Sequence, residues 1–96
     1  MTAYIIANIE VRDAASYERY RRDVPGTIEK YGGRFLVRGG AVEALEGGFV
    51  PKRIVVLEFP SVERAKAWWN SPEYRPLLEL RKSASQGDLF LVEGVK

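Results

Sequence analysis

The stretch AYIIANIEV, residues 3–11, alternates in the way that is typical of a β-strand with one buried face. One side of this predicted strand carries Ile5, Ala7, Ile9 and Val11, and the other carries Tyr4, Ile6, Asn8 and Glu10. Asp13 follows closely and is a favoured N-cap residue, so we expect a helix to begin there. The start of the chain therefore predicts a strand that leads directly into a helix.

The segment after Asp13 carries apolar residues at spacings of three and four, which is the pattern of an amphipathic helix. This stripe consists of Tyr17, Tyr20, Val24, Ile28 and Tyr31. It crosses Pro25 and stops at Gly32 and Gly33. Because proline lacks a backbone N–H and clashes with the preceding turn, we expect the helix to be kinked or broken near Pro25.

The rest of the chain predicts further strands and a helical region in two parts. The expected elements are strand 34–38, continued by strand 41–45 after Gly39 and Gly40; strand 53–59; a helix from the N-cap Ser61 to Asn70; a second helix that starts at Ser71 and Pro72, continues through Arg81 despite Pro76 and ends at Gln86 and Gly87; and strand 89–92. The order βαββαβ predicts a ferredoxin-like α+β fold, with a four-stranded antiparallel sheet and the helices on one face. Ninety-six residues suffice for one domain, expected to span residues 1–96.

Alternation assigns the strand residues to two sheet faces. The face expected to meet the helices carries Ile5, Ala7, Ile9, Phe35, Val37, Val55, Leu57, Phe59, Phe90 and Val92. The opposite face is expected to carry Tyr4, Ile6, Asn8, Leu36, Arg38, Ile54, Val56, Glu58, Leu89, Leu91 and Glu93. That second face is too apolar to be left in water, so we expect a homodimer in which two sheets form a shared barrel.

Composition excludes several classes of function. The chain has no Cys and no His, which removes thiolate nucleophiles, imidazole bases, haem-ligating histidine and ordinary zinc, copper or iron sites, so no metal and no cofactor are expected. The net charge of +2 is spread evenly along the chain, so no nucleic-acid partner is expected. The first residues lack the charged region and long apolar stretch of a signal peptide, and no apolar run approaches the length that spans a bilayer, so a cytoplasmic protein without a membrane partner is expected.

Several segments resemble one known family. They are YIIANIEV (4–11), GGRFLVRGG (32–40), VVLEFPS (55–61), WWNSPEY (68–74) and DLFLVEG (88–94), together with Arg81. The chain closely resembles the domain of unknown function 1330 family from residue 4 to residue 94. The resemblance implies a dimeric α+β barrel, in a superfamily that also holds cofactor-free antibiotic-biosynthesis monooxygenases, muconolactone isomerase-like proteins and haem enzymes. The lack of His separates this chain from the haem branch.

Glu58 is a candidate catalytic residue because it lies in an otherwise apolar strand. By the alternation above it shares a face with Arg38 and Asn8. A carboxylate in such a place must be paired, hydrogen-bonded or protonated. It is therefore a candidate general base, with Arg38 holding an anionic ligand and Asn8 orienting it. The alternative is a structural Glu–Arg pair that fixes the sheet register or the dimer.

A second group of candidates lies on the helices. Trp69 and Tyr74 are expected to form aromatic walls, Arg81 to hold an anionic group, and Tyr20 to offer a hydroxyl at the pocket mouth. The alternative for the aromatic residues is that they belong to the core. Trp68 and Trp69 point about 100° apart on a helix, so the more exposed of the two is the better ligand candidate.

Two classes of function stay open at this point. The first is a homodimer that binds a small anionic or aromatic ligand in a barrel pocket and transforms it without a cofactor, by proton transfer or monooxygenase-like chemistry. The second is a non-catalytic binding or stress-associated accessory homodimer. A polar pocket open to ligands favours the first class, and a pocket filled by side chains favours the second.

Overall fold

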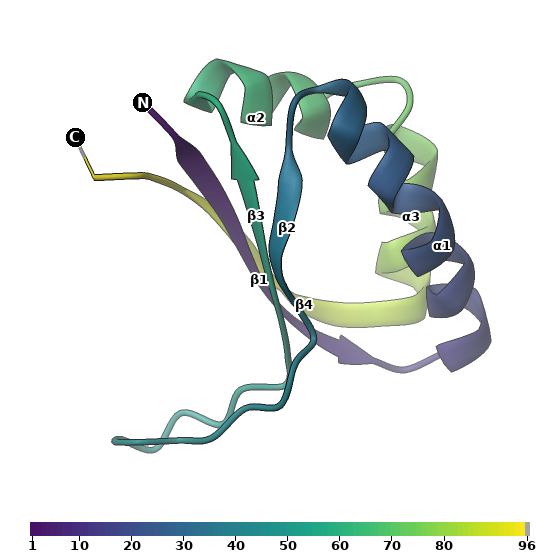
Figure 1. The fold of residues 1–96 in the computed structure, drawn as a ribbon. Helices are drawn as coiled ribbons and strands as arrows, with labels where there is room; N and C mark the ends of the chain where they lie inside the picture. The colour runs from purple at the N-terminus through teal and green to yellow at the C-terminus, as the bar shows by residue number, and fades with distance from the viewer. Residues whose placement is uncertain (96) are drawn as a thin grey trace.

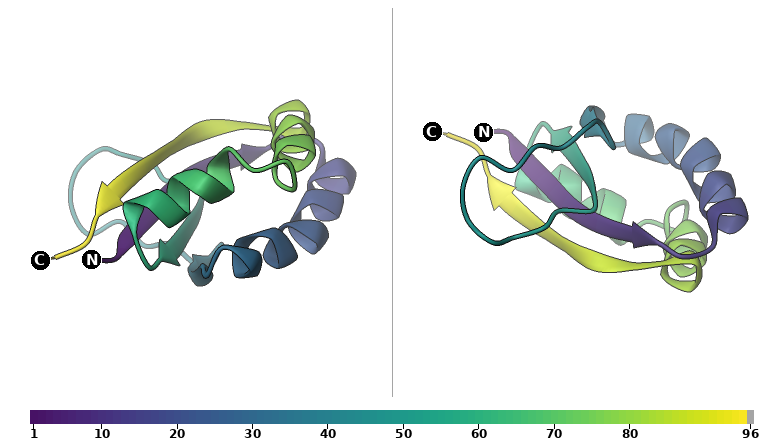
Figure 2. Two further views of the ribbon diagram at one scale, coloured as in Figure 1. Left: turned by 90° about the horizontal axis from the view of Figure 1, so that it is seen from above. Right: turned by 90° about the horizontal axis from the view of Figure 1, so that it is seen from below.

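The computed structural model describes residues 1–95 and shows a four-stranded antiparallel sheet in the order β2-β3-β1-β4 (Figure 1). Lys96, the last residue of the predicted domain, lies outside the described residues. The elements are β1 (Ala3–Val11), α1 (Ala14–Lys30), β2 (Arg34–Arg38), β3 (Arg53–Phe59), α2 (Val62–Trp69), α3 (Arg75–Ala84) and β4 (Ser85–Glu93). The helices lie along one side of the sheet and the two termini lie close together (Figure 2). The predicted ferredoxin-like α+β fold is confirmed.

The hydrophobic core lies between the helices and the central strand β1. Every second residue of β1 from Ala3 to Ile9 is at most 5% exposed. Trp68 joins the layers, because its ring centre lies 4.0 Å from that of Tyr74 and 5.5 Å from that of Phe59. Its indole N–H also donates to the hydroxyl of Thr27 on α1, at 2.9 Å. None of the helices within residues 1–95 is long and apolar enough to cross a membrane.

Capping residues explain where the helices begin. The carboxylate of Asp13 accepts a hydrogen bond from the backbone N–H of Ser16 at 3.2 Å, and the hydroxyl of Ser61 accepts one from Arg64 at 3.1 Å. Both N-caps were predicted. The start of α3 was placed too early: the Ser71 hydroxyl accepts the N–H of Tyr74 and closes a single turn, and α3 begins only at Arg75. Pro76 then lies in the first turn of α3, where its missing N–H costs nothing.

Two strand boundaries also differ from the prediction. β2 ends at Arg38, and residues 41–45 form no strand but belong to a loop, residues 39–52, that extends away from the helices (Figure 1). Gly39 ends the strand because its φ of +71° lies in the left-handed region that favours glycine. β4 begins at Ser85, four residues before the predicted start, because residues 85–88 pair with residues 8–11 of β1.

The register reverses the predicted faces of Val37 and Arg38 in β2 and of residues 89–92 in β4. In β2 an irregularity between Phe35 and Val37 places Val37 opposite Val56 and Arg38 opposite Val55, so Arg38 faces the helices and Val37 faces away. In β4, Leu89 and Leu91 lie opposite Ala7 and Ile5 and face the helices. Phe90 and Val92, predicted to be inward, are 55% and 43% exposed. The Leu-Phe-Leu-Val sequence is apolar throughout, so alternation alone could not set its phase.

Pro25 does not break α1, which runs as one curved helix (Figure 2). Because Pro25 has no N–H, the carbonyl oxygen of Arg21, four residues earlier, loses its intrahelical donor. The guanidinium of Arg38 donates a hydrogen bond to this oxygen. A side chain of β2 therefore replaces the backbone donor that the proline removes, which ties the middle of α1 to the edge of the sheet.

Substituting two glycines should have opposite effects on stability. A Cβ at Gly33 would lie 2.5 Å from Phe59 Cε1 and 2.8 Å from Ile28 Cγ2, both in the core. We expect Gly33→Ala to lower the free energy of unfolding by about 1 to 3 kcal/mol through overpacking. Gly26, inside α1, has no atom within 4 Å of the added carbon, so Gly26→Ala should raise stability by about 0.5 to 1 kcal/mol. Urea denaturation measures both, and equal effects would contradict the packing argument.

The replacement of the Pro25 donor by Arg38 predicts an energetic coupling between the two residues. Arg38→Met should lower the free energy of unfolding by about 1 kcal/mol in the native sequence, because the Arg21 carbonyl is left without a donor. In a Pro25→Ala background the new N–H of residue 25 can donate instead, and the same substitution should cost about 0.5 to 1 kcal/mol less.

Denaturant unfolding of the four proteins in this double-mutant cycle measures the coupling. Arg22→Met is the matched control, because that arginine lies on the exposed side of α1 and pairs only with Asp23. An Arg38→Met cost that is the same in both backgrounds would show that the guanidinium does not replace the missing donor.

Candidate functional site

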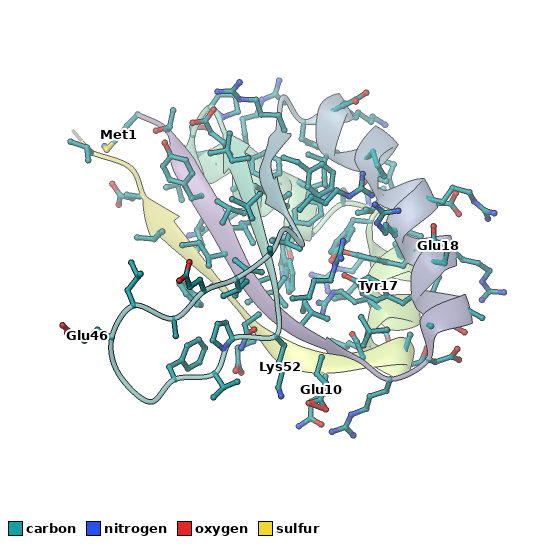
Figure 3. All side chains as sticks on the ribbon, turned by 60° about the horizontal axis from the view of Figure 1, so that its bottom comes forward. Met1, Glu10, Tyr17, Glu18, Glu46 and Lys52 are labelled. Atoms are coloured by element: carbon teal, nitrogen blue, oxygen red, sulfur yellow. The ribbon has the colours of Figure 1, made fainter. Side chains whose placement is uncertain are left out.

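A small, partly open pocket with a cavity volume of about 40 Å³ lies between α1 and the helix-facing side of the sheet. We call it the α1 pocket. It is lined by apolar residues of both layers and by polar side chains; the lining is Ala7, Ile9, Tyr17, Tyr20, Arg21, Val24, Ile28, Phe35, Arg38, Arg53, Val55, Leu57, Arg81 and Leu89. Tyr17 points from α1 toward the sheet, and Glu18 beside it points outward (Figure 3). The pocket thus combines apolar walls with a small set of polar groups.

The charged residues of the α1 pocket are all arginines. Of these, Arg21 pairs with Glu18 at 3.5 Å on the exposed side of α1. Within residues 1–95, no carboxylate lies within salt-bridge distance of Arg38, Arg53 or Arg81. Burying a guanidinium without a counter-ion costs free energy, because the group loses its hydration without gaining a charged partner. The α1 pocket is therefore an electropositive, partly apolar environment.

Arg81 is the most deeply buried of these groups. It comes from the last turn of α3, is only 5% exposed, and its Nε has no hydrogen-bond partner among the described residues. The hydroxyls of Tyr20 and Tyr74 lie 3.0 Å apart close by. Burial raises the pKa of Tyr20 well above its usual value, and the neighbouring Tyr74 adds to this, while the charge of Arg81 acts in the opposite direction. Tyr20 therefore keeps its proton and can act only as a hydrogen-bond donor or acceptor.

Arg38 and Arg53 form a second cationic group, where β2 ends and β3 begins. The guanidinium of Arg38 lies over the Phe35 ring at 4.3 Å, and that of Arg53 lies 5.6 Å from the centre of the Tyr17 ring. Arg53 packs against Gly39 so closely that a Cβ there would meet Nη1 at 2.2 Å, and its buried Nε has no partner within residues 1–95. Burial, together with the charges of Arg21 and Arg53, lowers the pKa of Arg38 from its usual value.

Glu58 lies on the other face of the sheet, so the prediction that it shares a face with Arg38 is wrong. Its carboxylate accepts hydrogen bonds from the Nε of Arg34 at 2.8 Å and from the Tyr4 hydroxyl at 3.0 Å. The hydrogen bond from Arg34, followed by that from Tyr4, lowers the pKa of Glu58 below its usual value and makes it a weaker base. Arg34 and Glu58 are also register partners, so the geometry favours the structural ion pair, with Arg34 in place of Arg38.

The remaining candidates are distributed around the molecule. Asn8 shares the outer face with Glu58, and its Oδ1 accepts the backbone N–H of Lys52, which ties down the end of the 39–52 loop. Tyr74 is fully buried and lines no part of the α1 pocket. Trp69, more exposed than Trp68, lines a separate groove of about 230 Å³ with Ala65, Lys66, Leu89, Phe90 and Leu91. Of the seven predicted site residues, the α1 pocket brings together Arg38, Arg81 and Tyr20.

Arg53 and Tyr17 are pocket residues that sequence reasoning did not select. The signal for Arg53 was present, because it continues the Val55, Leu57 and Phe59 series that was assigned to the helix-facing side. Tyr17 was assigned to the core stripe of α1, which is correct for most of its ring. Across residues 1–95, no cluster of three or more acidic side chains is arranged to hold a metal ion.

Comparison with solved structures shows the same fold in proteins of low identity. RPA0582 from Rhodopseudomonas palustris, a protein of unknown function, matches with a TM-score of 0.80 at 21% identity, over 99% of this chain and 83% of that one. SnoaB, a cofactor-independent oxygenase from Streptomyces nogalater, matches with a TM-score of 0.64 at 11% identity, over 99% and 94%. A structure described as an antibiotic biosynthesis monooxygenase matches with a TM-score of 0.59 at 14% identity, over the whole of both chains.

At these identities the solved structures are similar to this chain in fold alone, and no curated protein matches it. The family comparison is more specific. One family model, domain of unknown function 1330, matches residues 2–95, which is nearly the whole sequence. The resemblance noted from the segments around β1, β2, β3 and α2 is therefore confirmed, and the chain belongs to the family described as domain of unknown function 1330.

Proposed function

We propose that the α1 pocket binds a small organic anion with an apolar body. The observation that carries the proposal is Arg81, a 95% buried guanidinium without a carboxylate partner in the described part of the chain. A carboxylate or another planar anion would accept hydrogen bonds from the free Nε and restore charge balance in the pocket. Side chains such as Val24, Ile28 and Leu57 would pack against the apolar part of the ligand.

The same residues limit the chemistry that the pocket supports. Its lining contains no carboxylate, and Tyr20 keeps its proton, so the pocket offers hydrogen-bond donors and positive charge but no base for proton abstraction. Such a donor set stabilises negative charge that develops on a ligand, as in an enolate or a phenolate. Cofactor-free oxygenation by O₂ proceeds from such an anion, so in this pocket the substrate would have to lose its proton to solvent before it binds; the fold likeness to the oxygenase SnoaB supports this class of reaction.

The lack of a base in the pocket lining equally supports the second candidate, an accessory protein that binds the anion without turnover. Both candidates share the anion-binding step. The separation of Glu58 from the pocket argues against proton transfer by that residue in either case.

The anion-binding proposal predicts opposite effects of one substitution with and without ligand. Arg81→Met should raise the melting temperature of the free protein, because it replaces an uncompensated buried charge by an apolar side chain of roughly similar volume. In the native protein, small carboxylates with apolar bodies, such as benzoate and hexanoate, should raise the melting temperature, whereas their neutral amides should not. Arg81→Met should abolish the effect of the carboxylates, while Arg22→Met, at an exposed arginine of α1, should leave it unchanged.

Thermal denaturation over a panel of acid and amide pairs tests this. If every amide stabilises the protein as much as its acid, or if the Arg81→Met protein responds to the acids as the native protein does, the pocket is not an anion site.

We further infer that the protein is a homodimer built through the open face, which is the sheet face turned away from the helices. This face carries Tyr4, Ile6, Asn8, Arg34, Leu36, Val37, Ile54, Val56, Glu58, Phe90 and Val92. Leu36, Phe90 and Val92 are between 43% and 55% exposed. Large exposed apolar patches usually mark an interface, so this exposure indicates that the face is covered by a partner. A second copy is the occupant that matches this surface, because two such sheets stack with their apolar centres in contact.

The 39–52 loop adds to the same surface. It extends away from the helices, with Glu46 near its far end (Figure 3). Within it Leu45, Phe49 and Val50 are between 68% and 92% exposed. Burying these apolar side chains against a second copy would remove them from water, which is favourable. The loop would then enlarge the proposed interface.

Light scattering tests the dimer. The native protein at micromolar concentration should have twice the chain mass of 10.9 kDa, and Phe90→Lys, which places a charge on the open face, should shift it toward the monomer. Val95→Lys is the control, because Val95 is 99% exposed and lies beyond the end of β4. A native protein of 10.9 kDa at this concentration would overturn the inference.

A further inference from the structure

The unpaired arginines of the α1 pocket lie in two separate groups. Arg81, with the Tyr20 hydroxyl beside it, comes from the last turn of α3. Arg38 and Arg53 come from the end of β2 and the start of β3, and the charge of Arg53 acts on Arg38. A ligand that fills the pocket therefore contacts Arg81 on the α3 side and the pair Arg38 and Arg53 where β2 ends and β3 begins.

The sheet provides an apolar floor between the two groups. The register aligns Leu89, Ala7, Val55 and Arg38 in one row across the four strands. Three of these residues are apolar, and the guanidinium stands at the β2 end of the row. Because neighbouring strands lie about 4.8 Å apart, a ligand that crosses this row extends over several carbon atoms.

Each group of arginines offers hydrogen-bond donors for one acidic group of a ligand, and neither is paired with a carboxylate of the protein in the described residues. At one end the free Nε of Arg81 and the Tyr20 hydroxyl can both donate. At the other end Arg53 has a buried free Nε, while one nitrogen of Arg38 is committed to the Arg21 carbonyl. A ligand with a single acidic group would leave the second group of guanidiniums without a counter-ion.

Resting on the proposed anion-binding function, we propose that the α1 pocket selects small organic diacids, with one acidic group held by Arg81 and Tyr20 and the other by Arg53 and Arg38. The apolar body between the two acidic groups lies over Ala7 and Val55. The selectivity comes from the need to pair two cationic groups at once, so a monoacid of the same size loses one of two charge-assisted contacts.

Isothermal titration with matched pairs of acids tests the proposal. The straight-chain diacids from succinate to pimelate are compared with monoacids of the same carbon number, and terephthalate is compared with 4-methylbenzoate. At least one diacid should bind tenfold or more tightly than its monoacid, with an optimum at one chain length that reflects the spacing of the two groups. Inorganic phosphate is included, because its charges are concentrated at one point.

Two variants assign the ends of the ligand. Arg53→Gln and Arg81→Gln should each reduce the affinity of the best diacid to near that of the monoacid. For the monoacid, which the proposed function places at Arg81, Arg53→Gln should have less than a threefold effect, because a single acidic group occupies one end only. Arg22→Gln, at an exposed arginine of α1 that pairs with Asp23, is the matched control. Circular dichroism and thermal unfolding of each variant confirm that the fold is kept.

The outcomes separate this proposal from the proposed function. If monoacids bind as tightly as diacids, or phosphate binds as tightly as the best diacid, selection of diacids is wrong and anion binding stands. If none of these anions binds, the proposed function is wrong, and the diacid inference fails with it. If diacids bind preferentially but neither arginine variant changes their affinity, the ligand lies elsewhere and the assignment of the two ends is overturned.

Discussion

The two antiparallel pairings of β1 determine where every other part of the molecule lies. This strand pairs with β3 on one side and β4 on the other, and its alternate residues from Ala3 to Ile9 are buried beneath the helices. The intervening Asn8 holds the end of the 39–52 loop on the open face. A shift of β1 by one residue would turn its buried side chains outward and separate the row that forms the floor of the α1 pocket. The pocket and the open face therefore depend on one register.

The parts of the fold that were predictable are those decided by local rules. Asp13 and Ser61 accept hydrogen bonds from backbone groups a few residues away, so their capping role can be recognised without knowing the rest of the structure. The faces of β2 and β4 depend instead on pairing with neighbouring strands. In β4 an unbroken apolar run carries no phase information, and in β2 the irregular register at residues 35–37 changes the phase within the strand.

The structure brings only some of the predicted site residues together in one pocket. Arginine and tyrosine were selected because no histidine or cysteine is available, and Arg38, Arg81 and Tyr20 do meet in one pocket. Glu58 was grouped with Arg38 by counting residues along β2, and this count fails at the irregular register. The result changes the character of the site: without Glu58 it holds positive charge and hydroxyl groups, which suit recognition of an anion more than proton abstraction.

The irregular register in β2 also has an evolutionary consequence. Leu36 is the extra residue that the strand accommodates between the pairs Phe35–Leu57 and Val37–Val56. A gene that lost the codon for Leu36 would encode a regular strand in which Val37 and Arg38 keep the faces they occupy here. The irregular register therefore lets this edge strand hold one residue more than a regular strand without moving the guanidinium out of the pocket.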